Sequence, residues 1–129
     1  MKALRFLSLV ILLLVTGCSP KTVNLTGADN GSSVTLRPSQ ELVIALESNP
    51  TTGYSWQVAE VDPAILAQVG ESEYKQSAGS EGLVGVGGTE TLRFEAVAAG
   101  EVTLTLGYAR PWETDVLPIE TFVVTVVVE

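Results

Sequence analysis

EVTLTLGY, residues 101–108, alternates polar and apolar side chains with a period of two residues. In an extended strand this period places four apolar side chains on one face, those of Val102, Leu104, Leu106 and Tyr108. The segments ETLRFEAV (90–97) and YSWQV (54–58) follow the same pattern. Val, Thr, Tyr and Phe, which strands favour, fill many of these positions. The sequence therefore predicts β-strands that are each half buried in a core.

Three further segments also read as strands: 34–36 (VTL), 40–47 (QELVIALE) and the Val-rich 121–129. Turn-forming residues separate them at short intervals. Only 62–69 could hold a helical turn, opened by Asp62 and Pro63, and it fits a turn into a strand equally well. Seven or eight short strands over about 100 residues predict an all-β, immunoglobulin-like β-sandwich with Trp56 in its core. An up-and-down barrel is the alternative fold.

Residues 1–17 have the order of a secretory signal peptide. Lys2 and Arg5 precede an apolar run over 6–15, which only Ser8 interrupts, and small residues follow. The run is about half of the ~20 residues that a membrane-spanning helix needs, so a short anchor helix is the less favoured alternative. We therefore expect the chain to be exported and residues 1–17 to be removed.

The segment Leu14-Val15-Thr16-Gly17-Cys18 resembles the lipobox of bacterial lipoproteins. The resemblance implies that Cys18 carries a diacylglycerol thioether, becomes the new N-terminus and anchors the chain in the cell envelope. Ser19, in place of Asp, implies the outer membrane in a host with two membranes. Cys18 is the only cysteine, so the alternative is a free thiol after an ordinary signal peptide. Residues 18–31 are then a lipidated tether, whose far end could begin the first strand, and residues 32–129 are the folded domain.

The composition excludes several kinds of chemistry. The chain contains no histidine, which rules out Ser-His-Asp and Cys-His nucleophile systems. With its one cysteine lipidated it also lacks an ordinary zinc site, and we expect neither a metal nor a cofactor. After loss of Lys2 and Arg5 the chain keeps five of its seven basic residues against all fifteen acidic ones, a formal net charge of −10. This charge repels phosphate backbones and argues against a nucleic-acid partner, so the sequence points to a binding protein that is not an enzyme.

Three segments between the strands have an unusual composition. Asn49-Pro50-Thr51-Thr52-Gly53-Tyr54 contains the Asn, Pro and Gly of a tight turn, which leaves the two threonines unexplained. The Gly- and Ser-rich segment 76–88 ends in Gly85-Val86-Gly87-Gly88 and is either a flexible connector or a binding loop. Arg110-Pro111-Trp112 combines two residue types that dominate protein interfaces, although the tryptophan could also fold back over the core.

Taken together and in this order, the three segments resemble the NPTTGY/F, GxGG and RPW loops of the chagasin-type inhibitors of papain-like cysteine proteases. The similarity covers residues 33–129 and implies an immunoglobulin-like sandwich whose three loops form a wedge at one end. It implies that Thr51 and Thr52 enter the active-site cleft above the catalytic cysteine, while Gly85–Gly88 and Trp112 contact either side. Inhibition would then be reversible and non-covalent, by occupation of the cleft, and we expect a monomer.

Two other functions remain open on the residues alone, because a fold does not fix a function. The same sandwich could be a structural or adaptor lipoprotein of the envelope that binds another protein through these loops. It could also bind sugars, with Trp112 and Tyr54 as a stacking platform.

Overall fold

The computed structural model describes residues 21–77 and 87–129. Within these ranges the chain forms nine strands and two short 3-10 turns, η1 (Gly27–Asp29) and η2 (Pro50–Thr52). The strands are β1 (Thr22–Thr26), β2 (Ser33–Leu36), β3 (Glu41–Ser48), β4 (Ser55–Glu60), β5 (Leu66–Gln68), β6 (Glu73–Gln76), β7 (Gly88–Ala96), β8 (Gly100–Ala109) and β9 (Glu120–Val128). No helix in this part of the chain is long and apolar enough to cross a membrane.

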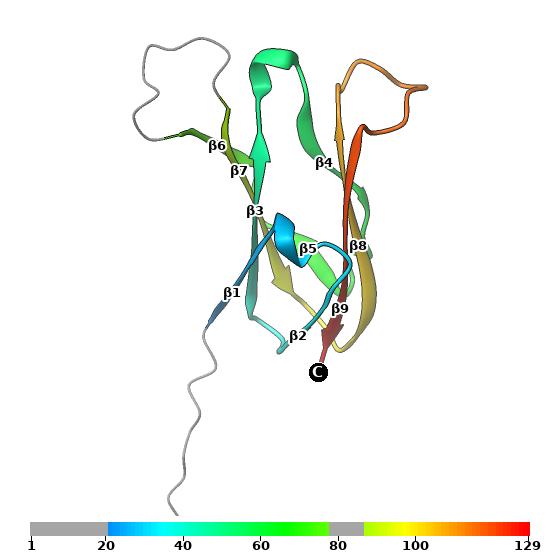
Figure 1. Ribbon diagram of the computed structural model, residues 1–129. Coiled ribbons are helices and arrows are strands. Elements are labelled where there is room, and N and C mark those ends of the chain that lie inside the picture. Colours follow the sequence, from blue (N-terminus) through cyan, green and yellow to red (C-terminus); the bar gives the residue numbers. More distant parts are fainter. Residues whose placement is uncertain (1–20, 78–86) are drawn as a thin grey trace, which may run out of the picture.

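The strands form two sheets that pack face to face (Figure 1). One sheet has the order β1-β3-β7-β5, with β6 also paired to β7, and the other has the order β2-β9-β8-β4. Most neighbours are antiparallel, but β1 runs parallel to β3 and β2 runs parallel to β9. The predicted immunoglobulin-like β-sandwich is confirmed, and the alternative of a closed barrel is wrong because the two sheets remain separate.

The core follows from the alternation seen in the sequence. In β8 the four predicted inward side chains, Val102, Leu104, Leu106 and Tyr108, are all buried. Phe94 of β7 and Phe122 of β9 are the largest fully buried side chains, and Trp56 is 6% exposed, as predicted for a core tryptophan. Burying one large apolar side chain stabilises a fold by about 1.5–3 kcal/mol, so this row of side chains holds the two sheets together.

The domain begins earlier than the sequence predicted. The range 18–31 was expected to be a tether, yet Thr22–Thr26 form β1 and pair in register with Glu41–Ala45 of β3. Leu25 is buried against the core, and η1 follows directly. The strand is only five residues long, and Gly27, Asn30 and Gly31 come soon after it, which hid its alternation among loop-like residues. Residues 21–129 therefore contain every described strand and the whole described core.

The segment in which a helical turn was considered contains the shortest strand, β5, and is followed by β6. Residues 62–69 form a turn into β5: the Asp62 carboxylate accepts the N–H of Ala64 at 3.0 Å, and its backbone oxygen accepts the N–H of Leu66 at 2.9 Å. β6, which the sequence analysis missed, is mostly exposed and polar, so it lacks the apolar alternation that reveals a strand.

The two ends of the sandwich carry different parts of the chain. The β3–β4 connection, which contains η2, and the β8–β9 connection lie at the same end (Figure 1). Because β1 is parallel to β3, and β9 leads away from the β8–β9 connection, Thr22 and Val128 lie at the opposite end. The chain thus enters and leaves the sandwich far from these two connections.

Candidate functional site

The β3–β4 connection is a compact turn built around Asn49. The Asn49 side-chain oxygen accepts the backbone N–H of Thr51 at 3.3 Å, as an N-cap does, and Pro50 occupies the first position of η2. Gly53 closes the turn in a left-handed conformation, with φ 84°, and donates its N–H to the Pro50 oxygen at 2.9 Å. Residues 49–53 therefore hold their shape largely by bonds among themselves.

The structure explains the two adjacent threonines. The Thr51 hydroxyl donates to the Asn49 side-chain oxygen at 2.6 Å, and the Thr52 hydroxyl donates to the Asn49 backbone oxygen at 2.7 Å. Both side chains remain exposed at the tip. Side chains of this kind favour turns because they bond to nearby backbone, so Thr51 and Thr52 stiffen the tip that they also form.

An aromatic stack connects this turn to the core. The Tyr108 hydroxyl accepts the N–H of Asn49 at 2.9 Å, and its ring lies 5.5 Å from the ring of Tyr54 and 5.0 Å from that of Trp56. The indole N–H of Trp56 in turn donates to the Glu47 oxygen at 3.0 Å. Aromatic rings at these separations stabilise each other in addition to the stabilisation from the apolar area that they bury. Because the hydrogen bonds and rings join the end of β3 to β4 and β8, the base of the turn is anchored on both sheets.

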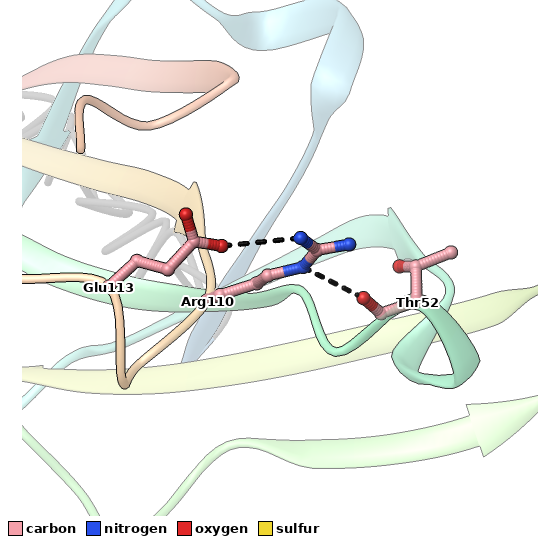
Figure 2. Close-up of polar contacts among 3 residues, drawn as sticks. All are labelled: Thr52, Arg110 and Glu113. Atoms are coloured by element: carbon pink, nitrogen blue, oxygen red, sulfur yellow. Dashed lines mark hydrogen bonds and ion pairs between the residues drawn. The ribbon is translucent and has the colours of Figure 1, made fainter.

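Arg110 links the β8–β9 connection to the turn at Asn49–Tyr54. Its Nε donates to the backbone oxygen of Thr52 at 3.0 Å, and its Nη1 lies 3.3 Å from the Glu113 carboxylate (Figure 2). The guanidinium also lies over the Tyr54 ring, 4.5 Å from its centroid. The partly exposed ion pair with Glu113 is worth about 1 kcal/mol at most, and it helps to orient the guanidinium toward Thr52.

Trp112 makes the second contact between the same two segments. Its ring lies against Gly53, so that a Cβ at position 53 would come within 3.1 Å of Cζ2 and collide with Cη2. The side chain nevertheless remains 67% exposed, so it does not fold back over the core, which was the alternative considered for it. Pro111 beside it is also exposed. The segments Asn49–Tyr54 and Arg110–Trp112 thus form one unit, which we call the paired loops.

The second predicted segment is only partly within the described residues. Gly85 and Val86 lie outside them, as does Cys18. Gly87 lies against the start of the β3–β4 turn, where an added Cβ would sit 3.2 Å from the backbone oxygen of Ser48. Gly88 begins β7 so close to β6 that an added Cβ would lie 2.8 Å from the Cα of Gln76. These two glycines therefore bring the end of segment 76–88 beside the paired loops, around a hollow of ≈ 450 Å³ lined by Ser48, Asn49, Ser77, Gly87, Tyr108 and Glu120 among others.

A buried carboxylate supports the site from below. Both oxygens of Glu90, on β7, accept the backbone N–H of Trp56, on β4 of the other sheet, at 2.8 and 3.0 Å. Burial raises the pKa of Glu90 above its ordinary value, and the hydrogen bond from Trp56 opposes part of that rise. The sequence analysis missed Glu90, although it occupies the same inward period as Leu92 and Phe94.

The arrangement is suited to contact and offers no group for covalent chemistry. The paired loops consist of turn backbone, two hydroxyls already engaged in hydrogen bonds, a guanidinium and an indole. Among the residues that the structure describes, no group of three or more acidic, His or Cys side chains is placed to hold a metal ion. The site is therefore a rigid projection that a partner can bind.

Comparison with known proteins assigns the chain to the same family as the three loop motifs of its sequence. The sequence model of the family described as "Chagasin family peptidase inhibitor I42" matches residues 35–126. The chain is 34% identical to chagasin of Trypanosoma cruzi over 91 residues, which is 68% of this chain and 81% of chagasin. It is 32% identical to amoebiasin-1 of Entamoeba histolytica over 90 residues, which is 70% of this chain and 84% of that protein.

Solved structures share the fold. The crystal structure of the cysteine protease inhibitor EhICP2 from Entamoeba histolytica superposes with a TM-score of 0.73 at 25% identity, over 84% of this chain and 96% of that one. PbICP-C, solved in complex with falcipain-2, has a TM-score of 0.58 at 17% identity, over 84% of this chain and 91% of that one. A family model over most of the chain, relatives above 30% identity and the sandwich itself all agree. The chain therefore belongs to the chagasin family of peptidase inhibitors and is not an enzyme.

Proposed function

We propose that this inhibitor of cysteine proteases acts on papain-like enzymes by placing the paired loops in the active-site cleft, with Gly85–Gly88 beside them. Thr51 and Thr52 form the tip that covers the catalytic cysteine, and Trp112 contacts one wall of the cleft. The observation that carries this proposal is the linkage of the two segments: Arg110 bonds to Thr52, and Trp112 rests on Gly53. PbICP-C, which shares the fold, was solved in complex with falcipain-2.

The proposed inhibition is reversible and needs no bond to the enzyme. A substrate is cleaved when its carbonyl reaches the thiolate in near-attack geometry, and a loop that cannot adopt this geometry fills the cleft without reacting. The internal bonds of Asn49 to Thr51 and Thr52 keep the turn in its own conformation. Because the loop is ordered before it binds, little conformational entropy is lost on association, which favours tight binding from a modest contact area.

A soluble form that begins at Lys21 tests this proposal, because it contains the whole described sandwich. We expect it to inhibit papain and a cathepsin L-type enzyme reversibly, to remain uncleaved, and to leave a serine protease unaffected. Thr51→Arg, which enlarges the tip, should abolish inhibition, whereas Thr103→Arg, an exposed substitution within β8, should not. Absence of inhibition at micromolar concentration across several papain-like enzymes would contradict the proposal.

We also propose that the chain is an exported bacterial lipoprotein, anchored through Cys18, in the outer membrane where the host has two membranes. The sequence Leu14–Cys18 supports the anchor, and the direction of β1 is compatible with it, because Thr22 lies at the end of the sandwich opposite the paired loops. Cys18 and Thr22 are separated by four peptide units, at most about 14 Å when extended. An anchored domain would thus stand close to the lipid with its paired loops directed away from it.

Expression in a bacterial host separates the anchor from the inhibitory activity. The unaltered chain should be processed, acylated and recovered with membranes, whereas Cys18→Ser should remain an unlipidated precursor. Ser33→Ala serves as a matched control at an exposed position of the sandwich. Normal maturation of the Cys18→Ser chain would refute the anchor and leave the inhibitor proposal untouched.

A further inference from the structure

Exposed apolar side chains gather in one connection of the molecule. Seven large apolar side chains are exposed in the described residues, and four of them lie between positions 112 and 119: Trp112 at 67%, Val116 at 57%, Leu117 at 85% and Ile119 at 57%. Single exposed apolar side chains are ordinary on protein surfaces, but several of them within one short connection are typical of an interaction site. We call Val116, Leu117 and Ile119 the apolar shelf.

The connection that carries the apolar shelf has a turn at one end and is fixed to the sandwich at the other. On one side the N–H of Glu113 donates to the Arg110 oxygen at 3.0 Å and closes a turn. On the other side the Pro118 ring packs onto Gly107, where an added Cβ would lie 2.8 Å from Cγ, and the N–H of Ile119 donates to the Tyr108 oxygen at 3.0 Å. Because the Pro118 ring lies against Gly107 and the Ile119 N–H bonds to Tyr108, Leu117 and Ile119 are presented on a backbone held against β8.

Acidic side chains flank the apolar shelf in the sequence. Asp115 precedes it and Glu120 follows it, and both are exposed. Glu113, by contrast, is paired with Arg110. A surface of this kind fits a partner that offers apolar contact next to basic side chains, because opposite charges at a rim speed association and discourage partners of the wrong sign.

We infer that the apolar shelf is a further protease contact, on the same connection as Trp112, which selects papain-like enzymes whose cleft rim on that side is apolar and basic. This inference rests on the proposed function, because Trp112 and the apolar shelf belong to the same ten-residue connection, and a protease held by Trp112 would lie beside it. The paired loops occupy the cleft, and the apolar shelf distinguishes among enzymes that have the same kind of cleft. A second copy of this chain is the competing occupant of such a surface.

The test compares inhibition constants of the soluble form from Lys21 and its variants against a panel of papain-like enzymes. Leu117→Ser/Ile119→Ser removes two side chains of the apolar shelf, and Val97→Ser is the matched control, since Val97 is 51% exposed in the β7–β8 turn at the opposite end. We expect the double variant to raise the inhibition constant at least tenfold for some enzymes and less than twofold for others, mainly through faster dissociation. Val97→Ser should change no constant by more than twofold. All of these side chains are exposed, and equal thermal midpoints will establish that the variants fold.

The outcomes separate a failure of the apolar shelf from a failure of the proposed function. Unchanged constants for Leu117→Ser/Ile119→Ser across the panel, with full inhibition by the unaltered chain, would overturn the apolar shelf as a protease contact and leave the proposed function standing. Self-association of the unaltered chain in sedimentation, lost in the double variant while inhibition is retained, would also overturn it in favour of a second copy. Failure of the unaltered chain to inhibit any enzyme would instead remove the proposed function itself.

Discussion

The ring of Trp112 rests on the backbone of Gly53, with a separation that no side chain larger than hydrogen at position 53 allows. Gly53 is required twice, because its φ of 84° also lies in the left-handed region that residues with a Cβ avoid. Positions 53 and 112 belong to different connections, and their contact turns two loops into one surface.

Gly53→Ala should raise the inhibition constant at least tenfold, because Trp112 must move away and the turn becomes strained by about 1–3 kcal/mol. Gly31→Ala is the matched control: Gly31 has the same φ of 84°, but an added Cβ there meets nothing within 4 Å. Both variants should lose a similar amount of thermal stability, and only the first should lose inhibition. Equal inhibition by the two variants would show that the contact with Trp112 is unimportant.

Trp112→Ala should weaken protease binding by about 2 kcal/mol or more, as truncation of a central interface tryptophan does. This corresponds to an inhibition constant roughly thirtyfold higher. The thermal midpoint should change little, because the side chain is 67% exposed in the free protein. In the double variant with Gly53→Ala the two effects should be less than additive, since either change alone already removes the contact.

Arg110→Lys keeps the positive charge and removes the planar fork that bonds to Thr52 and lies over Tyr54. We expect the inhibition constant to rise several-fold because the paired loops lose part of their order before binding. Arg93→Lys provides the comparison. Arg93, on β7, forms an ion pair with Glu41, on β3, at 3.1 Å and lies outside the paired loops. A lysine at position 110 that inhibits as well as arginine would contradict this role of the guanidinium.

Glu90→Gln should change how stability depends on pH. Burial raises the pKa of Glu90 above 4.5, so the folded protein binds this proton more tightly than the unfolded chain does. The contribution of Glu90 to stability is therefore largest below about pH 4.5 and falls as the pH rises through the folded pKa. The free energy of unfolding of the Glu90→Gln variant, relative to that of the unaltered chain, should rise over this interval in urea titrations at pH 4 to 7. Glu95→Gln, at an exposed position of the same strand, is the comparison variant, and parallel curves for Glu90→Gln and the unaltered chain would count against the buried carboxylate.

The strands that the sequence predicted well are those whose side chains alternate over many residues. Residues 101–108 became the centre of β8, and Trp56 entered the core because its neighbours on either side are polar or small. β1 and β6 were missed for different reasons. The first has one buried side chain, Leu25, and is too short to separate from the turn that follows it, and the second is exposed at the edge and has no apolar face.

The contacts that make the site could not be predicted from local sequence. Arg110 and Thr52 are 58 positions apart, and only the pairing of β4 with β8 brings their connections together. Thr51 and Thr52 resemble ordinary polar turn residues until their bonds to Asn49 are seen. Glu90 was overlooked because an acidic side chain is usually assigned to the surface, whereas here a backbone N–H of the opposite sheet compensates its burial.

The parallel pairing of β1 with β3 has a mechanical consequence. Thr22–Thr26 lie alongside Glu41–Ala45, and the free end of β1 points away from the paired loops. If the chain is held at its N-terminus while a bound enzyme pulls on the loops, the load acts along the strands. Every hydrogen bond of this ladder then resists the pull in shear at once, whereas a load across the strands would open the ladder one bond after another. A five-residue strand can in this way secure a tethered inhibitor against the force of a captured enzyme.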